Sequence, residues 1–453
     1  MYRNILFALT FLVAAQPALA QEAKPVWQAG VAKTVITPKQ SMWMSGYGSR
    51  NKPAEGKVHD LWAKALILQD ASGKRGLLIT LDLVGIDKQL SDEVCDDVQK
   101  KHGLERDQIM LACSHTHCGP VVGKNLIAMY NFDEKQHELV KNYTKELHRQ
   151  LVELVGAAIK DMKLTQLTWN NGFTTFATNR RTNKEKDVPK MRDLGQLNGP
   201  VDHDVPVLCV RDPDGKVLAI VFGYACHATV MDFYQWSGDY PGFAQLELEK
   251  RHPEATALFF AGCGADQNPL PRRKNELAET YGKQLAEAVD QVVKAPMKPI
   301  EPRMKTTFTR IDLPFGELPS REKIVQDTMS KNATIASRAK MLLADIEKTG
   351  SLKATYPYPI QAWQLGKDLT WIALGGEVVV DYSVRLKKEL GRVWVAGYTN
   401  DVMAYIPSLK VLKEGGYEGD TSMIYYGLPT AWGPRVEELI VGEVHGRVAR
   451  VRK

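Results

Sequence analysis

Largely apolar runs alternate with longer amphipathic stretches through the first two thirds of the chain. Apolar runs of the kind found in strands covered on both faces lie at Gly76–Ile86, Gln108–Cys113, Val217–Tyr224 and Ala255–Ala261. Two stretches between them, Glu134–Met162 and Glu276–Val293, place apolar residues on one face at helical spacing. The alternation predicts an α/β protein with a layered, mixed β-sheet core flanked by helices.

The pattern changes at Ala295–Arg303, where three prolines indicate a connector. Beyond it, further strands are expected at Lys305–Leu313, Trp371–Leu374 and Val393–Val395. We predict one helix over Ser320–Lys348 with Ser320 as its N-cap, and helical structure at Val436–Val441.

The first twenty residues have the three parts of a signal peptide. Arg3 gives a positive start, Ile5–Ala15 is apolar, and Ala18–Ala20 is a small-x-small cleavage site. The alternative, a membrane anchor, is disfavoured because the apolar run is too short to span a bilayer. We therefore expect cleavage after Ala20, a mature chain starting at Gln21, and a secreted or periplasmic protein with at most peripheral membrane contact.

Composition excludes several classes of protein. The 453 residues are 44% hydrophobic, 25% charged and 8% aromatic, which argues against disorder, collagen and coiled coil. A net charge of +6 is a mild basic bias and does not predict nucleic-acid binding. The six cysteines contain no C-x-x-C pair, so we expect mostly buried free thiols rather than a cysteine-based zinc site.

Polar residues follow three of the apolar runs directly, where α/β proteins build their sites. His115 and His117 follow the second run, and in an extended segment both can face one cavity. They fit either a metal pair or two hydrogen-bonded structural histidines. His227 follows the third run, and Glu377 follows Trp371–Leu374 after two glycines. Taken alone, His227 fits an ordinary hydrogen-bonded polar group at a strand end, and Glu377 fits a solvated turn residue.

Taken together, two or three histidines and one carboxylate are a common ligand set for catalytic zinc, which keeps one position for water. The remaining histidines lie in polar, helical or tail contexts and are expected to be surface or structural: His59, His102, His137, His148, His203, His252 and His445.

The string SHTHCGP at Ser114–Pro120 resembles the SHTHSGP motif of the neutral/alkaline non-lysosomal ceramidase family. Further segments resemble that family in the same order along most of the chain: Ala29–Pro38, Met44–Tyr47, His59–Ala65, Thr80–Leu83, Asn179–Arg181, Ser237–Gly242, Gly397–Asn400 and Tyr417–Gly419.

The resemblance implies a zinc amidase whose catalytic domain spans residues 21–453. By position it implies Zn²⁺ ligands at His115, His227 and Glu377, with Tyr405 as the fourth, and it places His117, Arg180 and Tyr417 at the reaction centre. Zinc would polarise the amide and supply the nucleophile, His117 would pass a proton to the leaving amine, and Arg180 and the tyrosines would stabilise the oxyanion. Without the resemblance, Arg180 would be read as a solvated surface charge and the tyrosines as core or loop residues.

The sequence departs from the family in two places. The family's Gly-Asp-x-Ser-Pro-Asn, whose serine has been assigned to the active site, corresponds to Gly262–Pro269, which contains no serine. Asn268 is the best match to that serine and Gln267 the alternative, so a zinc-water mechanism is expected. The family's enzymes also usually continue into a C-terminal β-sandwich domain, whereas the present sequence ends at Lys453 and is expected to hold the catalytic domain alone.

The leading hypothesis is an exported zinc-dependent amidohydrolase of an N-acyl amide, ceramide-like by resemblance, releasing a sphingoid base and a fatty acid. One alternative is a zinc hydrolase of a different amide or ester, from an amino sugar or a small lipid. Another is a non-catalytic relative that binds lipid or glycan. The partner in each case is a small molecule or a lipid, and the oligomeric state is left open.

Overall fold

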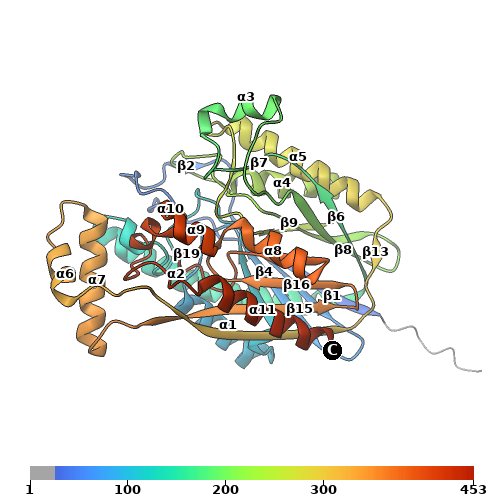
Figure 1. Ribbon diagram of the computed structural model, residues 1–453. Coiled ribbons are helices and arrows are strands. Elements are labelled where there is room, and N and C mark those ends of the chain that lie inside the picture. Colours follow the sequence, from blue (N-terminus) through green and yellow to red (C-terminus); the bar gives the residue numbers. More distant parts are fainter. Residues whose placement is uncertain (1–25) are drawn as a thin grey trace, which may run out of the picture.

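The computed structural model describes residues 26–453, so the predicted signal peptide lies outside the described residues. The largest sheet has nine strands, ordered β11-β9-β8-β6-β1-β3-β4-β5 with β13 paired to β6. Its neighbouring strands β9, β8 and β6 are labelled in Figure 1. Its strands are β1 Trp27–Val35, β3 Trp62–Gln69, β4 Arg75–Leu81, β5 Ile109–Cys113, β6 Lys163–Phe173, β8 Asp204–Arg211, β9 Val217–Tyr224, β11 Thr256–Ala261 and β13 Lys298–Pro299.

A second, four-stranded sheet has the order β14-β15-β16-β18, with bounds Met304–Pro314, Thr355–Leu365, Leu369–Leu374 and Val393–Ala396. Short pairs join β2 Gly56–Lys57 to β10 Gln235–Trp236, β7 Ala177–Asn179 to β12 Gln267–Pro269, and β17 Glu377–Val378 to β19 Tyr405–Ile406. Both larger sheets mix parallel and antiparallel neighbours.

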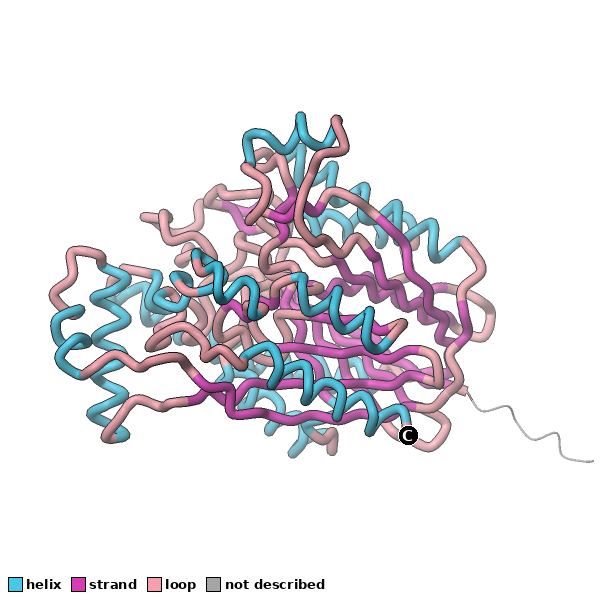
Figure 2. Tube along the Cα trace, in the orientation of Figure 1, coloured by secondary structure: helices cyan, strands magenta, loops and turns pink. Residues whose placement is uncertain are grey.

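Helices cover the outer faces of the two sheets (Figure 2). Those near the first sheet include α1 Lys88–His102, α2 Glu134–Lys160, α3 Val188–Asp193, α4 Asp239–Arg251 and α5 Asn275–Lys294. The later ones are α6 Arg321–Asp327, α7 Ala333–Thr349, α8 Val380–Leu390, α9 Leu409–Glu414, α10 Gly416–Gly419 and α11 Val436–Arg452. Helix α2 contacts β1 and β3, α4 contacts β11, and α11 contacts β14 and β15.

The two sheets pack face to face through an apolar layer. Phe260 of the first sheet meets two tryptophans of the second, Trp371 and Trp394, and Leu78 and Met110 belong to the same buried cluster. Alternate residues of the same strands point to the helices, as a strand covered on both faces requires. The order helix, sheet, sheet, helix confirms the predicted layered α/β core flanked by helices.

The predicted single helix over Ser320–Lys348 is wrong, because the chain forms α6 and α7 with a break at residues 328–332. Ser320 does cap α6, accepting a hydrogen bond from the Lys323 amide. Asn332 then caps α7 by accepting bonds from the amides of Thr334 and Ile335, which starts a new helix in the middle of an apolar pattern.

The first apolar run also ends earlier than its composition suggests. Strand β4 stops at Leu81, where the Leu83 amide turns back to the Leu81 carbonyl, so Asp82–Ile86 is a buried loop rather than strand. The six cysteines are all buried and free, as predicted. No helix among residues 26–453 is long and apolar enough to cross a bilayer.

Candidate metal centre and reaction cavity

Two strands at opposite ends of the nine-stranded sheet are brought together by the segment that follows β18. Thr399 bridges Ala112 of β5, and Ala396 bridges Gly262, the residue after β11. Beyond the strand ends, Thr116 pairs with Ala228, and the His117 amide donates to the Ala228 carbonyl at 3.2 Å. This pairing places the first two histidines beside His227, although more than a hundred residues separate them.

A second short pairing places the carboxylate. In β17 and β19, Glu377 is the register partner of Tyr405. The preceding Gly376 has φ +74°, and a Cβ there would meet the Ala404 carbonyl oxygen at 2.7 Å. Glycine is therefore required for the turn that carries the chain from β16 to Glu377, beside the histidines.

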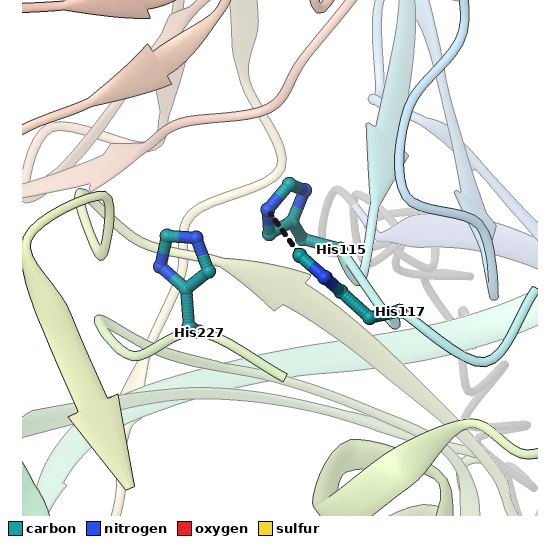
Figure 3. Close-up of side chains that lie close together, drawn as sticks. All are labelled: His115, His117 and His227. Carbon is teal, nitrogen blue, oxygen red and sulfur yellow. Dashed lines mark hydrogen bonds between the residues drawn. The ribbon is translucent and has the colours of Figure 1, made fainter. Parts of the chain in front are cut away.

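The predicted ligand atoms converge. The Oε2 atom of Glu377 lies 3.1 Å from Nε2 of His115 and 3.2 Å from Nε2 of His227. The Tyr405 hydroxyl lies 3.2 Å from Nε2 of His227. His117 lies in the same cluster, its Nε2 3.2 Å from that of His115, and the three imidazoles surround one point (Figure 3).

Hydrogen bonds from Nδ1 of His115 and of His227 determine which form of each imidazole nitrogen faces the cluster. Nδ1 of His115 lies 2.7 Å from the Val84 carbonyl, and Nδ1 of His227 lies 2.8 Å from the Gly264 carbonyl. A carbonyl only accepts, so both Nδ1 atoms carry the proton and both Nε2 atoms present lone pairs. Lone pairs of two imidazoles and a carboxylate then face one another. These lone pairs repel one another unless a cation lies between them.

The electrostatics agree with a neutral His227 and an ionised carboxylate. Burial, followed by the charge of Arg180, lowers the pKa of His227 to about 4. Burial raises the pKa of Glu377, but positive charge at His115 and His227 outweighs it and holds that pKa well below its ordinary value. With both imidazoles neutral, a bound cation would supply that charge. Deprotonated imidazole and carboxylate are the forms that bind metal, so the donor set fits zinc.

His117 is held differently from the other two histidines. Its Nδ1 is buried without a hydrogen-bond partner, and burial and the neighbouring imidazoles lower its pKa. The Tyr47 ring lies 4.7 Å from its ring, and Arg50 donates to its backbone carbonyl at 2.6 Å. A Cβ on Gly46 would lie 2.4 Å from Nδ1, so the backbone approaches this imidazole closely.

His115 itself has a left-handed backbone, with φ 61°. The segment is therefore not the regular extended strand from which we expected His115 and His117 to share a side. They meet because His115 is bent toward the centre, with its ring 4.3 Å from that of Tyr398. A non-glycine residue in this region is strained, and such strain is commonly retained at functional sites.

Opposite the ligands stands a second group, here called the arginine wall: Arg180, Arg181, Asn268, Tyr417 and Glu418. Arg180 donates to Glu418 at 2.7 Å, to the Tyr405 hydroxyl at 3.2 Å and to Asn268 at 3.3 Å. Burial opposes its charge, but Tyr405 and Glu418 raise the pKa of Arg180 well above its ordinary value. Arg180 is thus a partly buried, permanently charged group beside the metal centre, with its side chain 19% exposed, and not the fully solvated surface charge that its sequence context suggests.

The two groups enclose a cavity of about 630 Å³ that is lined by His117, His227, Tyr405 and all five wall residues. Tyr417 is 40% exposed at its mouth, with its ring 5.2 Å from that of Tyr405. Asn268 lines the cavity, whereas Gln267 is fully buried and donates to the Pro200 carbonyl. Of the two candidates for the position of the family's serine, the structure therefore places Asn268 in the cavity.

Sequence reasoning missed three residues. The Tyr426 hydroxyl donates to Oε1 of Glu377, Glu418 binds both arginines, and Tyr47 covers His117. Tyr47 and Glu418 lie inside the quoted segments Met44–Tyr47 and Tyr417–Gly419, so proximity to a motif was the available signal for them. Tyr426 lies in an irregular segment, and no sequence pattern distinguishes it.

Comparison with known protein families gives one match over more than half of the chain. The family described as "Neutral/alkaline non-lysosomal ceramidase, N-terminal" matches residues 27–278. That stretch contains His115, His117, His227, Arg180 and Asn268, whereas Glu377, Tyr405 and Tyr417 lie beyond it.

Curated relatives are distant. The neutral ceramidase of Pseudomonas aeruginosa is 23% identical over 259 residues, which is 55% of this chain and 37% of that protein. Neutral ceramidase A of Dictyostelium discoideum is 25% identical over 216 residues, or 46% of this chain and 29% of that protein. The aligned stretches thus cover well under half of either relative.

Solved structures share the fold more extensively. The crystal structure of the Pseudomonas aeruginosa neutral ceramidase has a TM-score of 0.71 at 19% identity, covering 95% of this chain and 76% of that one. A structure described as ceramidase complexed with C2 also has a TM-score of 0.71, at 18% identity, covering 94% and 76%. At these identities the likeness establishes the fold.

Proposed function

The chain belongs to the neutral/alkaline non-lysosomal ceramidase family, and on that premise we propose that it is a zinc-dependent amidohydrolase that cleaves an N-acyl amide. Both curated relatives named above are ceramidases, and a ceramide is itself an N-acyl amide, so this bond is the natural candidate. The proposal assigns the reaction to residues 21–453 as one catalytic unit.

The observation that carries the proposal is the convergence of acceptor atoms at one buried point. Nε2 of His115 and His227 lie 3.1 and 3.2 Å from Oε2 of Glu377, with both histidine tautomers fixed by backbone carbonyls. Two nitrogens, a carboxylate and a neighbouring phenol match a catalytic zinc site with a position left for water. Zinc bound there supplies Lewis-acid activation of the amide carbonyl and of water.

His117 suits the proton transfer. It lines the cavity and lies beside the ligand set, yet its Nδ1 is not bound to a carbonyl as those of His115 and His227 are. Its lowered pKa keeps the imidazole neutral and able to accept a proton from the nucleophile, which it then delivers to the leaving amine.

The arginine wall suits the developing negative charge. The Arg180 guanidinium is fixed by Glu418 and Asn268, and it reaches the Tyr405 hydroxyl next to the ligand set. A fixed cation facing a buried cavity stabilises an oxyanion without reorganising during the reaction. Tyr417, at the mouth, adds a hydroxyl on the same side.

We further propose that the protein is exported, on the signal-peptide pattern of residues 1–20. N-terminal sequencing of the protein recovered from the periplasm or the medium should begin at Gln21. A start at Met1, or retention of the full chain in the cytoplasm, would contradict export.

Zinc stoichiometry tests the metal assignment. The purified chain should hold about one zinc, and His115→Ala or His227→Ala should lose both the metal and the turnover of amides. A loss of Lewis-acid catalysis worth several kcal/mol corresponds to about a thousandfold or more in rate. His445→Ala, on the exposed side of α11, serves as the control and should keep both.

Two outcomes would overturn the proposal. Failure to bind zinc even after reconstitution would leave the fold without its chemistry and favour a non-catalytic binding protein. Zinc binding with turnover of O-acyl esters but of no amide would favour the esterase alternative.

A further inference from the structure

The cavity beside the metal centre is walled mainly by ion-paired side chains. Arg181 bonds to Glu414 at 3.0 Å and to Glu418 at 2.6 Å, and Arg272 bonds to Glu185 at 2.9 Å. All of these residues line the cavity. Any ligand that fills it therefore meets charges on more than one side.

Aliphatic surface is nearly absent from the same cavity. Among its described lining residues, Leu270 is the only one with an aliphatic hydrocarbon side chain, and it is 1% exposed, so its surface is already covered. The rest of the lining belongs to charged, polar, glycine and tyrosine residues, so its apolar area lies on ring and stem carbons next to charged or hydrogen-bonding groups. A long acyl chain gains affinity by burying its methylenes against apolar surface, and this cavity offers little.

Exposed apolar side chains do not gather in the cavity lining either. The large apolar side chains exposed on residues 26–453 include Phe173, Leu194 and Met329, and of all of them Tyr417 alone lines the cavity. Within the cavity, an acyl chain would therefore meet one exposed ring and otherwise charged or polar residues.

Resting on the proposed function, we infer that the cavity takes a compact, hydrophilic N-acyl amide. Its acyl group is short, and its amine half carries several hydrogen-bonding groups that face the arginine wall. An N-acylated amino sugar has this chemistry, and a long-chain N-acylsphingosine does not.

The test is an acyl-length series on one hydrophilic amine, with the zinc-loaded full chain. N-acetyl-, N-butanoyl-, N-hexanoyl- and N-octanoylglucosamine are compared below their micelle concentrations, alongside N-acetyl- and N-octanoylsphingosine. An apolar acyl site would raise kcat/KM by about fourfold per methylene. We expect kcat/KM to stay level or fall from acetyl to octanoyl, and the sugar amides to exceed the sphingosine amides.

The contrary outcomes are distinct. A rise in kcat/KM with each methylene, and fastest turnover of N-octanoylsphingosine, would overturn the inference while leaving the proposed amidohydrolase intact. No turnover of any amide in either series would remove the proposed function and this inference with it.

A paired variant tests the cause. Arg272→Leu with Glu185→Leu replaces one ion pair of the cavity lining, outside the arginine wall, by apolar surface. It should raise the octanoyl-to-acetyl ratio of kcat/KM about tenfold, the gain of one to two buried methylenes. The matched control, Arg149→Leu with Glu153→Leu, changes an exposed pair on α2 and should leave the ratio unchanged. An unchanged ratio in the Arg272 variant would contradict a polar wall as the source of selectivity.

Discussion

The two sides of the cavity are built by different means. On the ligand side, His115 and His227 follow strands and are anchored by backbone carbonyls, and Glu377 is fixed by strand pairing with Tyr405. On the arginine wall, side chains hold one another, with Glu418 bound to both Arg180 and Arg181.

This difference separates what each side contributes. Backbone anchors orient the ligand side without help from charges, so it is preorganised to hold a metal whatever fills the rest of the cavity. The wall is preorganised by ion pairs and presents positive charge to whatever binds. Substitutions on the ligand side should therefore cost metal and activity together, whereas substitutions on the wall should cost activity and spare the metal.

The largest expected effect that separates metal binding from activity is at His117. This residue lies next to the ligands, but no backbone carbonyl holds its Nδ1 as carbonyls hold those of His115 and His227. His117→Ala should lower kcat by about 10²- to 10⁴-fold, the usual contribution of a positioned acid–base group, while retaining most of the zinc. Zinc content and kcat measured on the same preparation check this. If the variant loses its zinc, His117 belongs to the ligand set and its assignment as a proton carrier is wrong.

Arg180 is the next test, and it addresses the wall directly. Arg180→Lys keeps the charge but loses the planar fork that reaches Glu418, Asn268 and Tyr405 together. We expect kcat to fall about 10²-fold with zinc unchanged, as when one oxyanion donor is lost. Arg251→Lys is the control, since Arg251 is ion-paired on α4 and does not line the cavity. An equal fall in both variants would indicate a general loss of stability rather than a role for the wall.

The contrast also explains what sequence alone could predict. His115, His227 and Glu377 follow apolar runs that end at one place in the fold, and strand ends are recognisable from hydrophobic patterning. Glu418 lies in the four-residue helix α10 and Tyr426 in a turn, and both segments are too short for periodicity to carry information. Their roles depend on contacts with Arg180 and Glu377 from distant parts of the chain.

The same limit applies to the fold. The long apolar strands and α2 were predictable because their patterns extend over many residues. The break between α6 and α7 depends on a single cap at Asn332, which a continuous apolar pattern conceals. The approach of β5 to β11 was also hidden, since it arises from bridges made by Ala396 and Thr399 far along the chain.

Tyr426 tests how the ligand side is held in place, and its expected effect on zinc affinity is smaller. Its hydroxyl donates to Oε1 of Glu377, leaving Oε2 toward the histidines. Tyr426→Phe should weaken zinc affinity by about 10- to 100-fold, the usual effect of losing a hydrogen bond behind a ligand, with little change in kcat at saturating zinc. Chelator competition measures the affinity. Tyr425→Phe, one residue away and without a contact to Glu377, is the control, and equal affinities in both variants would remove Tyr426 from the metal centre.

Asn268 is expected to have the smallest effect and bears on how the wall is oriented. Its Oδ1 accepts from Arg180 at 3.3 Å, a long hydrogen bond and one of three that position the guanidinium. Because Glu418 and Tyr405 remain, Asn268→Ala should lower kcat/KM by about tenfold or less, the worth of one such bond, with zinc retained. Gln267→Ala is the matched control, because the Gln267 side chain is buried away from the cavity. The melting temperature of this variant should fall, while its kcat/KM should stay unchanged. Full turnover by Asn268→Ala would show that this loop carries no chemical step and that Arg180 is fixed by Glu418 and Tyr405 without it.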